Sequence, residues 1–434
     1  MTTIFSPITS ISNSSVTIIR ISGSSTQDIL KQLGFKGKTI HQKASLQKII
    51  DPENKEILDE ALITFFATPN SFTGEDVAEI SLHASSYIVK RLIKILSTFY
   101  DCRLAQAGEF SRTAFLNNKF DLTQAEAIVD LIKSETKLQH QQSIKQLSGN
   151  LGKIYDRWTL ELIEISALIE AAIDFPDEDL PEDIINGVNK RVDSLKQEIE
   201  GHLDDNKVAQ KIKEGINLAI IGAPNTGKSS LINFLAKSDV AIVSDIPGTT
   251  RDVVDVHLEI SGMQVKISDT AGIRETKDKI EQLGIDRALL KSSEADLKIY
   301  LIDASNPIIH DDLVDKNTIL IANKIDLLNN KTDSDVALAI SLKDNYNTDK
   351  IFQILSNRIL DLVPKENHSL ITQERYRLAL INAKENLNDF TLDKEIELAA
   401  EDLRQATIEI GKITGKIDVE KILDVIFSKF CIGK

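Results

Sequence analysis

The spacing of hydrophobic positions changes several times along the 434-residue chain. Short runs rich in β-branched and aromatic residues predict strands at 16–21, 61–66 and 75–83. Between 85 and 100 the apolar residues recur every three or four positions, which predicts a helix. The first region, 1–118, is therefore expected to be a mixed α/β domain.

Helical spacing dominates the next region and returns near the end of the chain. From about 123 to 175, apolar residues recur at three and four positions with no proline, which predicts long helices. Pro176 and Pro181 interrupt the pattern, and a further helix is predicted over 182–213. The tail from about 369 to 427 again has helical spacing.

A different pattern lies between the two helical stretches. From 216 to about 362, short apolar runs alternate with helical ones, as in a parallel sheet covered by helices on both faces. The simplest arrangement is a helical domain with this α/β domain inserted into it. The predicted boundaries are 1–118 for the N-terminal domain, 119–213 and 363–434 for the two parts of the helical domain, and 214–362 for the inserted domain.

Composition narrows the class of protein. The chain is 42% hydrophobic and 27% charged, which is typical of a soluble globular protein, and its length predicts two or three domains. We find no apolar run near the ~20 residues of a membrane helix and no signal peptide. Two cysteines, Cys102 and Cys431, indicate a cytoplasmic protein without a disulfide framework. The net charge of −15 argues against a protein that coats nucleic acid.

The strongest local motif is a phosphate-binding loop. Residues 222–229 read GAPNTGKS, which fits G-x-x-x-x-G-K-S. A short apolar run precedes it and an apolar helical pattern follows it, so the loop would point its backbone N–H groups at phosphates from a helix N-terminus. Lys228 would then reach the β- and γ-phosphates, and the Ser229 hydroxyl would bind Mg²⁺. Alone, such a match is also compatible with a chance glycine turn.

Two later motifs support the loop. Residues 269–272 read DTAG after a predicted strand, so Asp269 would hold Mg²⁺ through water and the Gly272 N–H would meet the γ-phosphate. Residues 323–326 read NKID after another strand. Asp326 would accept two hydrogen bonds from guanine, which adenine does not offer. Three motifs in this order predict a GTP-binding domain.

The same motif places two further residues on the base, and a later loop is a weaker candidate. Asn323 would contact the other edge of the guanine, and the Lys324 stem would cover its face. Residues 341–343 read SLK where related loops often read S-A-K.

The means of hydrolysis differs from the common pattern. Ile273 follows D-T-A-G where many small GTPases place a water-orienting glutamine. Arg251 and Arg274 are not obvious arginine fingers. The Asn225 amide oxygen is placed to bind a monovalent cation beside the phosphates. The loop 244–252 would turn backbone carbonyls to the same ion, while the Thr250 hydroxyl binds Mg²⁺.

These motifs, with others along the chain, resemble those of the TrmE/MnmE family of tRNA-modification GTPases. IPGTTRD, DTAGIRETKDKIE and NKID follow GAPNTGKSS in the α/β region. The N-terminal and central signatures are SFTGEDVAEI at 71–80 and GEFSRTAFLNNKFDLTQAEAIVDLI at 108–132. DFPDED at 174–179 and FCIGK at 430–434 extend the resemblance over almost the whole chain.

The resemblance implies a three-part protein: an N-terminal α/β domain that binds tetrahydrofolate and dimerises, a helical domain, and an inserted Ras-like P-loop G domain. Family members are homodimers whose G domains meet across K⁺, which replaces an arginine finger. With the flavoprotein MnmG (GidA), in a heterotetramer, they add an aminomethyl or carboxymethylaminomethyl group at C5 of the wobble uridine of certain tRNAs. The one-carbon donor is 5-formyl- or methylene-tetrahydrofolate.

The resemblance also assigns residues. Glu281 matches the catalytic glutamate, Ser229 and Thr250 the Mg²⁺ ligands, and Asn225, Ser244, Ile246 and Thr249 the K⁺ ligands. Folate contacts fall on Arg20, Glu79, Lys119 and Lys434, since carboxylates suit Arg and Lys and pterin N–H groups suit a carboxylate. The GTP-binding set is Asn225, Thr226, Gly227, Lys228, Ser229, Ser230, Ser244, Asp245, Ile246, Pro247, Gly248, Thr249, Thr250, Asp269, Thr270, Ala271, Gly272, Asn323, Lys324 and Asp326.

Some positions depart from the family pattern or allow another interpretation. Residues 7–15 read PITSISNSS and 82–86 read LHASS where family members have glycine-rich runs, and Pro247 replaces an alanine. Arg20 is alternatively an ion-paired strand residue. Cys431 is either a nucleophile or a contact of the folate pocket.

Two other functions fit the motifs less well. One is a GTP-dependent ribosome-assembly factor without modifying chemistry, which needs an RNA-binding appendage that the acidic helices after 362 do not resemble. The other is a nucleotide-switched scaffold whose partner does all the chemistry.

Overall fold

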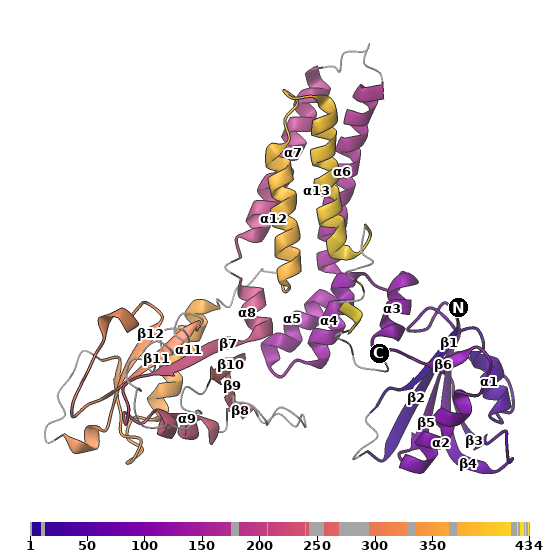
Figure 1. Cartoon of the computed structure of the whole chain (residues 1–434), viewed down its shortest axis with the longest axis horizontal. Helices are drawn as coiled ribbons and strands as arrows, with labels where there is room; N and C mark the ends of the chain where they lie inside the picture. The colour runs from indigo at the N-terminus through magenta and orange to yellow at the C-terminus, as the bar shows by residue number, and fades with distance from the viewer. Residues whose placement is uncertain are drawn as a thin grey trace, which may run out of the picture. The chain divides into compact units, whose positions relative to one another are not determined.

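The computed structural model describes residues 2–9, 14–174, 182–205, 207–238, 240–242, 256–268, 295–328, 336–363, 371–417, 423, 426–428, 430 and 433. The chain forms two compact units, drawn with their helices and strands in Figure 1. Unit 1 comprises Met1–Val129, Gln146–Val192 and Glu385–Lys434, and unit 2 comprises Asp130–Lys145 and Asp193–Lys384. These units divide the helical segments between them, so they are not the predicted domains, whose boundaries stay a prediction.

Unit 1 contains a sheet of six described strands in the order β3-β4-β5-β2-β1-β6, antiparallel except for the parallel pair β1 and β6. The strands are β1 (Thr3–Pro7), β2 (Val16–Ser22), β3 (Ala44–Ile50), β4 (Ile57–Phe66), β5 (Val77–His83) and β6 (Cys102–Leu104). The predicted strands at 16–21, 61–66 and 75–83 are confirmed, with β5 starting two residues later.

One face of this sheet carries the core. Helices α1 (Thr26–Gln32) and α2 (Ser86–Leu96) pack their apolar residues against Ile19 and Ile21 of β2 and Ile80 of β5. Because side chains alternate along a strand, Arg20 and Glu79 point to the opposite face. The helix predicted over 85–100 is confirmed but ends at Leu96.

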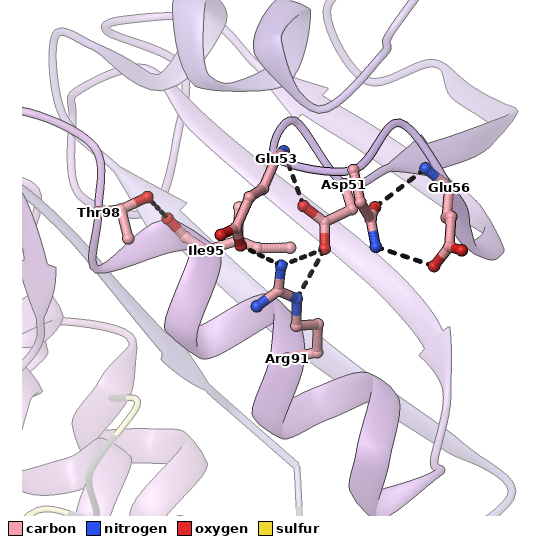
Figure 2. Close-up of polar contacts among 7 residues, drawn as sticks. Asp51, Glu53, Glu56, Arg91, Ile95 and Thr98 are labelled. Atoms are coloured by element: carbon pink, nitrogen blue, oxygen red, sulfur yellow. Dashed lines mark hydrogen bonds and ion pairs between the residues drawn. The ribbon is translucent and has the colours of Figure 1, made fainter.

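A polar network ties α2 to the turn between β3 and β4 (Figure 2). Arg91 Nε donates to Asp51 Oδ2 at 2.6 Å, and Arg91 Nη2 donates to Glu53 Oε2 at 2.6 Å. The Glu53 N–H also donates to Asp51 at 2.9 Å. Burial alone would raise the pKa of Asp51, but the Glu53 N–H and Arg91 hold that pKa below its ordinary value.

Long helices complete unit 1. Helices α6 (Asn150–Asp174) and α13 (Ile396–Thr414) lie side by side (Figure 1). On α6 the buried residues include Tyr155, Trp158, Leu162, Ile165 and Ile169, which recur at helical spacing. Trp158 is therefore a core residue, with its ring 5.6 Å from that of Tyr155.

The helical stretches have breaks that spacing alone does not reveal. The region 123–175 contains α4 (Leu122–Ile132), α5 (Lys137–Leu147) and α6, separated at 133–136 and 148–149. Gln139 Oε1 accepts the Glu135 and Thr136 N–H groups, which provides a side-chain cap for α5.

The later helices also divide. The single helix predicted over 182–213 is α7 (Glu182–Leu203) and α8 (Val208–Glu214), because Asp205 accepts the Lys207 N–H in a turn between them. The predicted helical tail contains α12 (Glu374–Asp389) and α13. The interruption predicted at 176–181 lies outside the described residues.

Unit 2 contains a sheet whose described strands run in the order β13-β12-β11-β7-β10-β9-β8. Pairs from β13 to β10 are parallel, while β9 and β8 pair antiparallel. The strands are β7 (Ile216–Ile221), β8 (Ala241–Ile242), β9 (Val256–Ile260), β10 (Met263–Ser268), β11 (Leu297–Asp303), β12 (Thr318–Asn323) and β13 (Leu338–Ala339).

The predicted α/β class is confirmed, and the described α-helices cover one face of this sheet. Helices α8, α9 (Lys228–Ala236) and α11 (Asp349–Leu362) contribute to the main apolar core. Leu313, in the short 3₁₀ helix Asp311–Leu313, packs with a second apolar cluster that includes Ile221 and Tyr300. The carboxyl ends of β7, β11 and β12 meet at one edge, where ligands of such sheets usually bind.

Candidate nucleotide-binding site

The phosphate loop 222–229 connects β7 to α9 and is shaped by its own backbone. Gly222 has φ +148° and Gly227 has φ +104°, values that side-chain-bearing residues rarely adopt. A Cβ on Gly227 would lie 2.4 Å from Asn323 Nδ2, and one on Gly222 would lie 2.2 Å from the Leu301 carbonyl oxygen. Both glycines are therefore required by the close approach of β11 and β12 as well as by φ.

Lys228 and the exposed side chains around it complete the loop. Lys228 Nζ donates to the carbonyl oxygens of Gly222 and Ala223, each at 2.9 Å. Asn225 has φ +64° and is exposed, and Ser229 and Ser230 at the start of α9 are also exposed. The ammonium group thus lies in the concave side of the loop, where phosphate oxygens bind in such loops.

The loop after β12 contacts the phosphate loop. Asn323 is 4% exposed, its Nδ2 donates to the Thr226 carbonyl at 2.9 Å, and its Oδ1 accepts the Leu342 N–H at 3.2 Å. Both ends of the amide are therefore fixed by main chain. This geometry joins the loop predicted to bind guanine to the loop predicted to bind phosphate.

Asp326 and Ser341 form the second pair of this loop. Asp326 is exposed in the 3₁₀ helix Ile325–Leu327, and Ser341 Oγ donates to its Oδ1 at 2.7 Å. The sequence pattern at 341–343 was a weak match, yet Ser341 contacts Asp326 and Leu342 contacts Asn323. The carboxylate is held by one neighbour and remains open to solvent, as a group that accepts hydrogen bonds from a base requires.

Many predicted site residues lie outside the described residues. They are Ser244, Asp245, Ile246, Pro247, Gly248, Thr249, Thr250, Asp269, Thr270, Ala271, Gly272, Glu281, Cys431 and Lys434. Their assignments stay predictions. Strand β10 ends at Ser268, so Asp269 follows directly from the strand that pairs with β7.

The residues predicted to bind folate form a second polar site in unit 1. Arg20 on β2 and Glu79 on β5 are opposite in register, and Arg20 Nε and Nη2 donate to Glu79 Oε1 at 3.0 and 2.7 Å. Their side chains are 13% and 24% exposed. The ion-paired alternative for Arg20 is confirmed, and folate binding there stays a prediction.

Aromatic rings surround this pair. The Arg20 guanidinium carbon lies 5.0 Å from the ring centroid of Phe72 and 5.6 Å from that of Phe110. Such cation–π contacts stabilise a partly buried guanidinium. Neither ring was predicted as part of the site, although Phe72 and Phe110 lie within the two family-like signatures. A phenylalanine by itself does not indicate a ligand site.

Two chain segments close on this site. Lys119 Nζ donates to the Pro69 carbonyl at 2.8 Å, and Asn117 Nδ2 donates to the Thr73 carbonyl at 2.7 Å, so the loop 69–75 is tied to the end of α3 (Glu109–Leu116). A Cβ on Gly433 would lie 2.4 Å from the Pro7 carbonyl oxygen, so Gly433 lies against the end of β1.

The described part of the chain holds no other metal or membrane signal. No group of three or more His, Cys, Asp and Glu side chains in it is arranged to hold a metal ion. Likewise, no helix within the described ranges is both long enough and apolar enough to cross a membrane.

Two family models match the chain. The model described as the GTP-binding protein TrmE N-terminus matches residues 3–119, and the MnmE helical domain model matches residues 122–431. The chain belongs to the MnmE/TrmE family. The resemblance seen in the sequence motifs is therefore confirmed.

Curated relatives match over the full length. The tRNA modification GTPase MnmE of Rickettsia akari (strain Hartford) is 45% identical over 445 residues, covering 100% of both chains. The MnmE of Rickettsia prowazekii (strain Madrid E) is also 45% identical with the same coverage. Among solved structures, the G domain of the T. maritima FeoB iron transporter covers 34% of this chain and 98% of its own, at 23% identity and a TM-score of 0.25.

Proposed function

We propose that this protein hydrolyses GTP as the GTPase component of tRNA wobble-uridine modification. The observation that carries the proposal is the hydrogen bond from Asn323 Nδ2 to the Thr226 carbonyl, 2.9 Å long, which joins a guanine-type loop to a phosphate loop. Membership in a family whose curated members are named tRNA modification GTPases supports the tRNA part of the proposal.

The described residues suit the two proposed cations. Lys228 holds positive charge inside the phosphate loop, and Ser229 presents its hydroxyl at the N-terminus of α9, where Mg²⁺ would neutralise phosphate charge. Asn225 presents an exposed amide oxygen at φ +64°, and we assign K⁺ to it together with Ser244, Ile246 and Thr249. Thr250 is the second Mg²⁺ ligand and Glu281 the catalytic group in this proposal.

Potassium dependence can be tested with salts of equal ionic strength. We expect GTP hydrolysis to be at least about tenfold faster in KCl than in NaCl, since the cation supplies charge that an arginine finger supplies elsewhere. Asn225→Ala should bring the two rates together without abolishing GTP binding. Equal wild-type rates in both salts would remove K⁺ from the proposal.

The polar site of unit 1 suits a folate in chemical terms. Both Arg20 hydrogen bonds go to Glu79 Oε1, so Arg20 does not engage Oε2, which would accept pterin N–H groups. Phe72 offers an aromatic wall beside Arg20, and Lys119 and Lys434 would bind folate carboxylates. We assign tetrahydrofolate, as the 5-formyl or methylene form, to this site.

The proposed assembly follows the family. We propose a homodimer that works with the flavoprotein MnmG (GidA) in a heterotetramer, in the cytoplasm and away from membranes. The product would be an aminomethyl or carboxymethylaminomethyl group at C5 of the wobble uridine in certain tRNAs. The flavin of the partner supplies the redox chemistry in this scheme.

Nucleoside analysis tests the function. We expect deletion of the gene in its host to remove the modified wobble uridine when total tRNA is digested and analysed by mass spectrometry, and the intact gene to restore it. An unchanged nucleoside profile, with GTPase activity present in the purified protein, would instead favour the ribosome-assembly or scaffold function.

A further inference from the structure

Lys324, the second residue of the guanine-type loop, has a side chain whose two ends are both fixed. Its backbone has φ +68°, directly after β12, so the chain turns sharply at this position. Its Nζ lies 2.7 Å from Asp303 Oδ2, at the end of the neighbouring strand β11. The four-carbon stem therefore spans the gap between two strand ends.

Asp303 is itself held in place. Its Oδ1 accepts the Ser305 N–H at 2.9 Å and the Ser305 hydroxyl at 2.6 Å. Asp303 pairs in register with Asn323, and the Ala304 N–H donates to the Asn323 carbonyl at 2.8 Å. One carboxylate oxygen is thus used to fix the Asp303 side chain and the other to fix Lys324.

The environment keeps this carboxylate ionised. Burial alone would raise the pKa of Asp303, but hydrogen bonds from Lys324 and Ser305 hold that pKa below its ordinary value. The Lys324 and Asp303 side chains are 31% and 21% exposed, so solvent screens the pair only in part.

We propose that Asp303 is a positioning residue for nucleotide binding, which holds the Lys324 stem as a preformed wall for the face of the guanine ring. The proposal deepens the nucleotide-binding function and rests on it. Neither a phosphate motif nor an N-K-x-D motif includes Asp303, which lies twenty residues earlier in the chain than Asn323.

The geometry predicts which affinities change. Without Asp303 the lysine side chain regains rotamer freedom, which binding must then remove, and this is equivalent to a loss of about tenfold in affinity. The wall contacts the ring face and neither the phosphates nor the edge of the base. The loss should therefore be equal for GDP, GTP and inosine diphosphate.

The experiment measures fluorescent-nucleotide binding to the full chain, with unlabelled GDP, GTP and inosine diphosphate as competitors. We expect Asp303→Ala to weaken all three about tenfold and Asp303→Asn, which keeps an accepting oxygen, to weaken them less. The chain offers a matched control in a second Lys–Asp pair: Lys298 of β11 has its Nζ 2.8 Å from Oδ2 of Asp315, which lies just before β12. Asp315→Ala should leave all three affinities within about twofold of wild type.

A double-mutant cycle tests that Asp303 acts through Lys324. Lys324→Met keeps much of the stem but removes the ammonium group, so Asp303→Ala should have no further effect in that background. Additive losses, an unchanged affinity in Asp303→Ala, or a loss for GTP alone would each overturn the proposal. Thermal unfolding of each variant shows whether a loss of affinity merely reports unfolding.

Failure of the proposed function would have a different signature. If the wild-type protein bound neither GDP nor GTP, the assignment of a nucleotide-binding site would itself be wrong. Asp326→Asn provides the positive control, because it should change the ratio between GDP and inosine diphosphate affinities, whereas Asp303→Ala should leave that ratio unchanged.

Discussion

The nucleotide site of unit 2 and the Arg20–Glu79 site of unit 1 are built in opposite ways. In unit 2, glycine conformations and strand ends create the site, and Asn225, Ser229 and Asp326 are exposed. In unit 1, the two charged residues satisfy one another at 2.7 Å on the middle of a sheet. The first arrangement depends on backbone conformation, and the second depends on one pair of charged side chains.

The difference has consequences for energy and for mutation. A backbone-built loop tolerates few changes of φ but contributes few buried charges to the fold. A paired guanidinium and carboxylate contribute to folding, because removing one leaves the other partly buried without its counter-ion. Substitutions in the phosphate loop of unit 2 should therefore weaken ligand binding with little loss of folding stability. Substitutions of Arg20 or Glu79 in unit 1 should lower folding stability as well.

The largest expected effect is in the phosphate loop. Gly227→Ala places a Cβ where Asn323 Nδ2 lies, in a backbone region that alanine avoids, and should weaken GTP binding at least about 100-fold. Isothermal titration of the purified protein measures this. Gly201→Ala on α7 is the matched control, since a Cβ there meets nothing within 4 Å, and it should bind GTP normally. Normal GTP binding by Gly227→Ala would contradict the claim that backbone conformation builds the nucleotide site.

A smaller effect is expected at the paired site. Arg20→Met keeps an apolar contact for Phe72 but leaves Glu79 without its partner, and should lower the free energy of unfolding of unit 1 by about 2 kcal/mol. Urea unfolding followed by far-ultraviolet circular dichroism measures this free energy. Arg20→Met with Glu79→Leu should recover part of the loss. An unchanged free energy of unfolding in Arg20→Met would show that the Arg20–Glu79 ion pair does not stabilise the fold.

The smallest effect is a pH dependence from the network of Figure 2. Because the folded-state pKa of Asp51 is lowered, its stabilising contribution is present above the ordinary value of 3.8 and is lost as pH falls through the folded-state pKa. The contribution to the slope is at most one proton, about 1.4 kcal/mol per pH unit. Asp51→Asn should make the free energy of unfolding depend less steeply on pH below pH 4, by no more than that amount. An unchanged slope would show that Asp51 does not titrate with folding.

More of the structure of unit 2 than of unit 1 could be predicted from the sequence. Strand, loop and helix around 222–229 follow from spacing within about twenty residues, so their order could be predicted. The break at 133–136 and the end of α7 at Leu203 could not be predicted, because they depend on hydrogen bonds made by the Gln139 and Asp205 side chains. Asp303 and Phe72 enter their sites from neighbouring strands and loops, and no local pattern marks a contact made only by folding.

The most direct test of the central claim combines the nucleotide site with the tRNA product. A strain lacking the gene is complemented with wild type, Gly201→Ala or Gly227→Ala, each at verified equal protein levels, and its tRNA nucleosides are measured by mass spectrometry. We predict that the first two restore the modified wobble uridine and that Gly227→Ala does not. Full restoration by Gly227→Ala would contradict the account, because modification would then not require the GTP site.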